Sequence, residues 1–209
     1  MVVNALADGC GLQVAPAQAR KFASDYHCFM VRRFDRTDTG QRLHFASAMT
    51  MTGHSDGDDA STGVSYLELA EVIMGHGAQP NADLRELWSR IVFNILVSNT
   101  DDHLRNHGFI LVPGKGWKLS QAYDMNPVAH ADGLKLNITD ADNALDLELA
   151  REVAAYFRLN LQEADATIEE FRSIVGQWRV VAQQVGLSAS EQDRMAGAFR
   201  LADSDAESP

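Results

Sequence analysis

The sequence predicts a mainly helical protein of the mixed α+β class, with two short β-hairpins. After residue 62, apolar residues recur in most segments at the spacing of amphipathic helices. Strand-forming residues gather in only two places, near residues 27–46 and near residues 109–120. The chain has 209 residues, of which 45% are hydrophobic and 22% are charged, so its composition is that of an ordinary globular protein.

The first 46 residues predict the end of a helix and then a hairpin. Apolar residues lead to Gly9, and glycine is favoured just past a helix end, so we expect a helix that is truncated at its start. The segment HCFMVRRF, residues 27–34, is rich in strand formers and predicts a strand. The turn-like cluster at 36–40 predicts that RLHFA, residues 42–46, pairs with this strand.

A polar segment separates this part of the chain from the helical part. Residues 50–62 contain glycines and show no periodicity, which is typical of a loop. Helices are predicted over Val64–Gly75 and over Asp83–Val97, and Asp83 with Glu86 resembles a capping box at the start of the second.

The rest of the chain predicts a hairpin and three further helices. Phe109–Val112, the turn PGKG and the segment from Trp117 predict a tight hairpin at 109–119. Ser188 and Glu191 form a capping box that opens the last helix. We expect helices near 145–157, 163–184 and 189–201, one domain over residues 1–202, and a disordered tail over residues 203–209.

The charge and cysteine content exclude several classes of protein. The 29 acidic and 18 basic residues give a formal charge of -11, which argues against a broad, sequence-independent grip on nucleic acid. Any DNA contact is therefore expected mainly through a partner. Cys10 and Cys28 form no zinc or disulfide framework, so we expect a reducing compartment, the cytoplasm. No apolar run reaches the roughly 18 residues of a membrane helix, so no membrane association is expected.

Polar residues gather at the end of the longest predicted apolar helix. The sequence NTDDHLRN runs from Asn99 to Asn106, directly after that helix. Asp101 and Asn106 have the D-x-x-x-x-N spacing of a phosphotransferase catalytic loop. The predicted hairpin follows, and a second carboxylate comes after it at Asp124. This order of loop, hairpin and acid matches the catalytic lobe of protein kinases.

Aspartate and asparagine side chains at these positions suit a reaction that transfers a negatively charged phosphoryl group. The reaction concentrates negative charge between nucleotide and acceptor, and hard oxygen ligands suit the Mg²⁺ that neutralises this charge. Asp101 is expected to accept the hydroxyl proton, while Asn106 and Asp124 hold the metal. Arg105 could offset phosphate charge, and His103 could orient the loop.

Two less specific interpretations compete with this one. An isolated Asp-Asp-His sequence after a helix is more often a solvated loop with a hydrogen-bonded histidine. The order of Asn99, Asp101, His103, Asn106 and Asp124 around a predicted hairpin favours catalysis instead. A metal-dependent hydrolase that uses Asp101, Asp102 and His103 would require a further histidine or carboxylate cluster, which no spacing in the sequence supplies.

Three motifs together resemble a known family. They are NTDDHLRNHGFILV at 99–112, SQAYDMNPV at 120–128 and RRFDR at 32–36. They are similar to the C-terminal kinase domain of HipA-family serine/threonine kinases, the toxins of HipA/HipB toxin–antitoxin systems. The resemblance covers nearly the whole chain and implies a kinase-like C-terminal lobe that uses ATP and Mg²⁺ to phosphorylate a protein substrate.

The resemblance also implies roles for individual residues. The family's proton acceptor falls on Asp101 and its metal ligands on Asn106 and Asp124. Its remaining nucleotide contacts fall on His103, Leu104, Arg105 and Tyr123, and its hinge beside the adenine on Arg32, Arg33 and Phe34.

The chain departs from the family pattern in one respect. Family members carry an N-terminal lobe with a nucleotide-binding lysine and a serine-bearing phosphate loop, and neither motif occurs in this sequence. We therefore expect a C-terminal fragment or a split kinase half, with a HipB-like antitoxin or a separate N-terminal lobe as its partner. The alternative is a non-catalytic kinase remnant that acts as a protein-interaction module.

Overall fold

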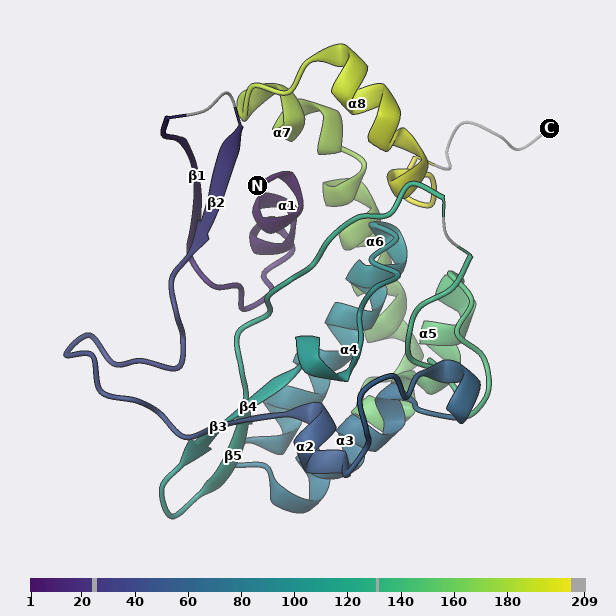
Figure 1. Cartoon of the computed structure of the whole chain (residues 1–209). Helices are drawn as coiled ribbons and strands as arrows, with labels where there is room; N and C mark the ends of the chain where they lie inside the picture. Colours follow the sequence, from purple (N-terminus) through teal and green to yellow (C-terminus); the bar gives the residue numbers. More distant parts are fainter. Residues whose placement is uncertain (24–25, 131, 204–209) are drawn as a thin grey trace.

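The computed structural model describes residues 1–23, 26–130 and 132–203 and confirms a mainly helical fold with small antiparallel sheets (Figure 1). Short 3-10 turns lie between or beside the helices and strands: η1 (Ala60–Thr62), η2 (Leu104–Asn106), η3 (Ala154–Phe157) and η4 (Ala196–Phe199). The helices are α1 (Val2–Gly9), α2 (Ala48–Thr52), α3 (Tyr66–His76), α4 (Pro80–Leu96), α5 (Leu147–Val153), α6 (Leu161–Val175), α7 (Trp178–Gln184) and α8 (Ala189–Met195). The strands are β1 (Ala17–Lys21), β2 (His27–Val31), β3 (Phe45–Ser47), β4 (Gly108–Val112) and β5 (Gly116–Leu119).

Helix α4 is the centre of the core. Its C-terminal half is buried on every side, which fits a sequence that is apolar all round from Ile91 to Leu96 except for Asn94. Helices α3, α5 and α6 and strand β5 pack against it. The fully buried Trp88 also donates its indole N–H to the backbone oxygen of Ala150 at 2.8 Å, which ties α4 to α5.

The hairpin predicted at 109–119 is confirmed, and a third strand extends it. Phe109 lies opposite Leu119 in the β4–β5 pair, and Phe45 lies opposite Ile110 in the β3–β4 pair. The sheet order is therefore β3-β4-β5.

The predicted pairing of residues 27–34 with 42–46 is wrong. Strand β2 pairs instead with β1, with Ala17 opposite Val31, while part of the second segment becomes β3 and joins β4. Only an isolated bridge joins Arg36 to Arg42. The sequence AQARK of β1 contains no β-branched or aromatic residue, so its strand character comes from pairing with β2 rather than from local propensity.

Several helix limits also differ from the prediction. The expected helix over 163–184 is two helices, because the chain turns at Gly176 between α6 and α7. The predicted 50–62 loop contains a turn of α2 at its start and the 3-10 turn Ala60–Thr62 at its end. The capping box of Ser188 and Glu191 is confirmed. Apart from Asp203, the predicted tail 203–209 lies outside the described residues.

The capping box predicted for Asp83 and Glu86 is wrong, because α4 begins three residues earlier at Pro80. Asp83 lies inside the helix, and its carboxylate accepts hydrogen bonds from the backbone N–H of Leu119 at 3.0 Å and from Nε2 of Gln79 at 2.8 Å. Burial raises the pKa of this carboxyl group. Asp83 therefore fastens β5 to α4 rather than capping the helix.

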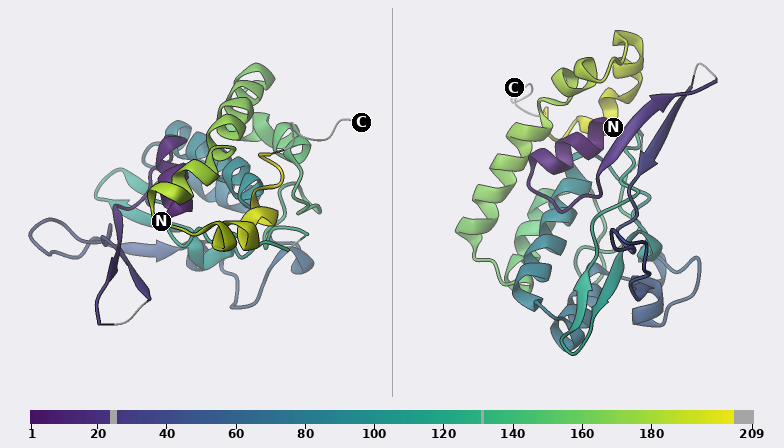
Figure 2. Two further views of the ribbon diagram at one scale, coloured as in Figure 1. Left: turned by 90° about the horizontal axis from the view of Figure 1, so that it is seen from above. Right: turned by 90° about the vertical axis from the view of Figure 1, so that its left-hand side faces the viewer.

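The β1–β2 hairpin projects from the rest of the molecule, beside α1 and the C-terminal helices (Figure 2). Its aromatic residues Phe22, Tyr26 and Phe29 are exposed by 67%, 84% and 50%. An isolated two-stranded hairpin is at best marginally stable in water, so this element depends on its attachment to the body.

We expect Asp83→Ala to lower the free energy of unfolding by about 1–3 kcal/mol, because it leaves the buried Leu119 N–H without an acceptor. Asp83→Asn should lower it less, since the amide oxygen can still accept that hydrogen bond. Urea denaturation of the two variants measures the difference. Equal losses would show that the acceptor at this position does not matter.

Candidate functional site

The segment that carries Asp101 begins at a sharp turn after α4. Ser98 has a positive φ of 49°, which ends the helix and redirects the chain. The backbone N–H of Asn99 donates to the oxygen of Asn94 at 2.9 Å, and the oxygen of Ser98 accepts from the N–H of Val128 at 3.0 Å. The turn is thereby joined to the segment that follows Asp124.

The adjacent residues Asp101 and Asp102 lie in opposite environments. Asp101 is exposed, whereas Asp102 is buried. One oxygen of Asp102, Oδ2, accepts hydrogen bonds from Tyr66 Oη at 2.6 Å, Asn94 Nδ2 at 2.7 Å and His107 Nε2 at 2.8 Å. Burial is the main cause that raises the pKa of Tyr66, and the negative charge of Asp102 is the second, so the Tyr66 hydroxyl stays protonated and donates.

Sequence reasoning did not identify the structural role of Asp102. The signal that could have found it is Asn94, a single polar residue in the most apolar stretch of α4. A buried amide there requires hydrogen-bond partners, and Asp102 supplies one of them.

Asn106 is oriented by the turn that it ends. It is the last residue of η2 (Leu104–Asn106), it is buried, and its Nδ2 donates to the backbone oxygen of Asp101 at 3.2 Å. Because the amide nitrogen is engaged in this way, Oδ1 is the atom of Asn106 that could bind a cation.

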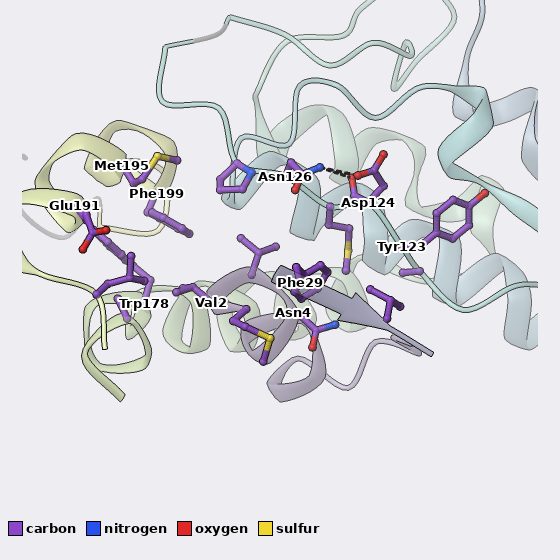
Figure 3. A pocket seen from close by; sticks show the side chains of 18 of the residues that line it. Val2, Asn4, Phe29, Tyr123, Asp124, Asn126, Trp178, Glu191, Met195 and Phe199 are labelled. Atoms are coloured by element: carbon purple, nitrogen blue, oxygen red, sulfur yellow. Dashed lines mark hydrogen bonds between the residues drawn. The ribbon is translucent and has the colours of Figure 1, made fainter. Parts of the chain in front are cut away.

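Asp124 has a special backbone conformation and an exposed side chain. Its φ of 58° lies in the left-handed region, which aspartate tolerates better than most residues. Oδ1 accepts a hydrogen bond from Asn126 Nδ2 at 2.7 Å, as the dashed line in Figure 3 shows. The other oxygen, Oδ2, remains for a further ligand.

Hydrogen bonds join the two candidate segments. The hydroxyl of Tyr123 donates to the backbone oxygen of Arg105 at 2.6 Å, and the backbone N–H of Asn126 donates to Oδ1 of Asn99 at 3.2 Å. Burial raises the pKa of Tyr123, so this hydroxyl also stays protonated. The structure therefore brings the 99–106 loop and the 123–126 segment into contact.

The two segments line different hollows. Asp101, His103, Leu104 and Arg105 line a hollow of about 220 Å³ together with the acidic segment 55–59. Tyr123 and Asp124 line a larger, mostly apolar pocket of about 650 Å³. Figure 3 shows this pocket, with Tyr123 and Asp124 at one end and Trp178 and Phe199 at the other.

Of the three residues predicted as a hinge, Arg32, Arg33 and Phe34, only Phe34 is seen to contact Tyr123. Phe34 lies against Tyr123, with ring centroids 5.3 Å apart. Arg32 and Arg33 instead form ion pairs with Asp38 and Asp35.

Arg105 is engaged by the acidic segment. It forms an ion pair with Asp56, whose side chain is itself 71% exposed. In the same segment, Asp59 pairs with Lys135 at 3.6 Å. His54 is held by Glu68 at 2.7 Å and by Asp58 at 3.4 Å. Arg105 and Lys135, the two basic residues of the small hollow, are thus partly neutralised by carboxylates of the acidic segment 55–59 that borders it.

The oxygen donors of Asn106 and Asp124 fit Mg²⁺, which keeps part of its coordination for phosphate and water, better than they fit a metal ion that protein side chains bind completely. The carboxylate of Asp124 and the amide oxygen of Asn106 are hard oxygen donors, and Mg²⁺ is commonly held by one or two carboxylates together with substrate phosphates. Among the described residues, no three or more His, Cys, Asp or Glu side chains are grouped to hold a metal ion. Nδ1 of His103 is buried and has no hydrogen-bond partner among the described residues.

Comparison with models of known protein families shows which family the chain belongs to. The model of the HipA-like C-terminal domain matches residues 1–178. The chain belongs to this family.

Relatives of this HipA-like chain are named as kinases. A Haemophilus influenzae protein named "Putative kinase" is 33% identical over 106 residues, which cover 48% of the chain and 31% of that protein. "Putative kinase Y4mE" of Sinorhizobium fredii is 29% identical over 138 residues, which cover 62% of the chain and 32% of that protein. The HipA-like chain thus spans about a third of the length of these relatives.

Solved structures confirm the kinase-like fold. HipA from the Shewanella oneidensis MR-1 complex of HipA, HipB and operator DNA matches with a TM-score of 0.80 at 19% identity, over 97% of this chain and 54% of that one. The Helicobacter pylori proinflammatory kinase CtkA matches with a TM-score of 0.61 at 12% identity, over 97% and 76%. In the described part of the HipA-like chain, no helix has the length and apolar content to cross a membrane.

We expect the pKa of His54 to lie above its ordinary value, mainly because of its hydrogen bond with Glu68 and less because of Asp58. The stability that this pairing adds is then fully present below about pH 6.5 and is lost as the pH rises through the folded-state pKa. An NMR titration of His54 should show a lower pKa in Glu68→Gln and a smaller decrease in Asp58→Asn. Glutamine can still cap α3, so Glu68→Gln removes the charge without removing the cap. An unchanged pKa of His54 in this variant would therefore contradict the assigned cause.

Proposed function

We propose that this chain is the catalytic-loop and metal-binding portion of a HipA-type protein serine/threonine kinase. One observation carries the proposal: the loop of Asp101 and Asn106 is hydrogen-bonded to the segment of Asp124, through Tyr123 to Arg105 and through Asn126 to Asn99. Three residues suited to phosphoryl transfer are thus held on two connected segments, in a fold that resembles HipA and CtkA.

Each residue has a role that its environment supports. Asp101 is exposed beside the small hollow, where it can accept a proton from a serine or threonine hydroxyl. Asn106 Oδ1 and the Asp124 carboxylate would hold Mg²⁺, which when bound neutralises charge on the transferred phosphoryl group. Phe34 and Tyr123 would border the nucleotide.

The basic and loop residues complete the proposed nucleotide site. Arg105 would have to exchange Asp56 for phosphate before it could offset the phosphate charge. His103 and Leu104 would contact the nucleotide from the same loop. Arg32 and Arg33 would do so only after leaving their carboxylate partners.

The proposed partners follow from length and charge. Because curated relatives are about three times as long as the matched region, we propose that an N-terminal lobe supplies the remaining phosphate contacts. A HipB-like antitoxin is a second proposed partner, since the Shewanella HipA structure contains HipB and operator DNA. With a net charge of -11, this chain would contact DNA mainly through that partner. The free cysteines Cys10 and Cys28 fit a cytoplasmic location.

A second candidate function is that of a non-catalytic interaction module. The projecting β1–β2 hairpin favours it, because Phe22, Tyr26 and Phe29 offer exposed aromatic surface to a partner.

We expect the chain alone to bind ATP weakly, and Asp124→Ala to weaken the Mg²⁺-dependent part of the affinity by about tenfold or more, since it removes the carboxylate ligand. Isothermal titration calorimetry with and without Mg²⁺ measures this. The exposed Asp140 provides the control variant, Asp140→Ala, which should leave the affinity unchanged. Tight, metal-independent ATP binding would contradict the proposed site.

We expect no protein phosphorylation by the chain alone, and Asp101-dependent transfer once an N-terminal lobe is supplied, fused or as a separate chain. The γ-phosphate must be fixed within reach of the acceptor hydroxyl, and positioning with electrostatics supplies most of this catalysis. In the complemented protein, Asp101→Asn should slow transfer by about 100-fold or more.

Transfer of radiolabelled phosphate decides between the outcomes. Robust transfer by the unaided chain would show that the lobe is dispensable. Transfer that persists in complemented Asp101→Asn would remove Asp101 from its proposed role, and no transfer under any condition would favour the interaction module.

A further inference from the structure

A series of hydrogen bonds runs from Asp102 to Asp124 through the side chains of Asn94 and Asn99 and through Asn126, which takes part with its backbone N–H and its side chain. Asn94 Nδ2 donates to Asp102 at 2.7 Å, and Asn94 Oδ1 accepts from Asn99 Nδ2 at 3.0 Å. Asn99 Oδ1 then accepts from the backbone N–H of Asn126 at 3.2 Å, and Asn126 Nδ2 donates to Asp124 at 2.7 Å. We call this series the amide relay. It begins one residue from Asp101 and ends on the proposed metal ligand.

The direction of the relay is fixed at its buried end. Asp102 Oδ2 can only accept, so Asn94 must present its nitrogen to Asp102 and its oxygen to Asn99. Asn99 must then turn its own oxygen toward Asn126. Turning either amide over would break two hydrogen bonds at once.

The middle of the relay is shielded from water. Asn94 and Asn99 are 2% and 0% exposed, and Asp102 is 3% exposed. Hydrogen bonds between buried groups are costly to leave unmade, because water cannot replace the missing partner. The links from Asp102 to Asn99 can therefore hold the Asp101 loop against the backbone of Asn126. The last link, from Asn126 to Asp124, lies at the surface.

We infer that Asn94, Asn99 and Asp102 are positioning residues, which set the placement of the Asp101 loop relative to Asp124 through the amide relay. This inference rests on the proposed phosphoryl transfer, because it assigns the three residues to that reaction without direct contact with its substrates. It goes beyond the proposed site, which contains none of the three.

The relay can be cut in its middle with a matched control. Asn94→Leu removes the link between Asp102 and Asn99, while Asp102 keeps its hydrogen bonds from Tyr66 and His107. Asn137 is also 2% exposed, and its Nδ2 donates to the backbone oxygen of Ala60 at 3.1 Å, outside the relay. Asn137→Leu therefore removes a comparable buried hydrogen bond elsewhere in the fold.

The first measurement does not depend on catalysis. In the chain as it stands, amide hydrogen exchange at Asn126 should accelerate by about tenfold in Asn94→Leu and stay unchanged in Asn137→Leu, since Asn126 is two links away from the substituted residue. Unchanged exchange at Asn126 in Asn94→Leu would overturn the inference. Asn94→Ala, which removes the same two hydrogen bonds with a smaller side chain, gives the same test if Asn94→Leu does not fold.

The second measurement is the kinetics of the complemented protein. A small displacement of reacting groups slows the chemical step strongly, so Asn94→Leu should lower kcat by about tenfold or more while KM for ATP changes less than about twofold. Asn137→Leu should change neither constant, and Asp102→Asn, which keeps an acceptor for Asn94, should keep most of kcat.

The outcomes separate the inference from the function on which it rests. An unchanged kcat in Asn94→Leu, or an equal fall in Asn137→Leu, would overturn the positioning role. An inactive parent protein would overturn the proposed function itself, and the exchange at Asn126 would still decide whether the relay couples the two segments.

Discussion

The carboxylate of Asp102 imposes the main constraint on the centre of this fold. A carboxylate that is almost removed from water must be satisfied by nearby donors, and Tyr66, Asn94 and His107 all converge on one of its oxygens. These donors come from the start of α3, from the C-terminal half of α4 and from the residue before β4. Three elements that are distant in sequence must therefore meet at one atom, and the loop between α4 and β4 has little freedom.

Local signals in the sequence predicted much of the fold. The hairpin at 108–119 has strand formers on both sides of a turn of proline and glycine, and the long helix α4 has a continuous apolar pattern, so the prediction of neither element depends on distant parts of the chain. The pairing of β1 with β2 and of β3 with β4 could not be predicted in this way. Which strand edge a segment occupies is decided by tertiary contacts, and the sequence of β1 has no strand propensity of its own.

The candidate site shows the same division. The spacing of Asp101 and Asn106 and the order of the hairpin and Asp124 are visible in the sequence, and the structure joins the two segments by hydrogen bonds. The contrast between exposed Asp101 and buried Asp102 is not visible, because two adjacent aspartates look alike until the elements around them are placed. Membership of the HipA-like C-terminal domain family fixes the fold, but the chemistry still has to be argued from individual side chains.

The left-handed backbone of Asp124 has a consequence for how this site could be lost. Glycine adopts such a conformation without strain, and asparagine tolerates it about as well as aspartate does. At this position, replacing aspartate by glycine would relieve backbone strain while it removes the proposed metal ligand, so local stability and the proposed metal binding favour different residues. A relative that had lost the proposed metal site would meet no conformational barrier to glycine at this position, so the residue at 124 is the one to inspect when asking whether a relative keeps that site.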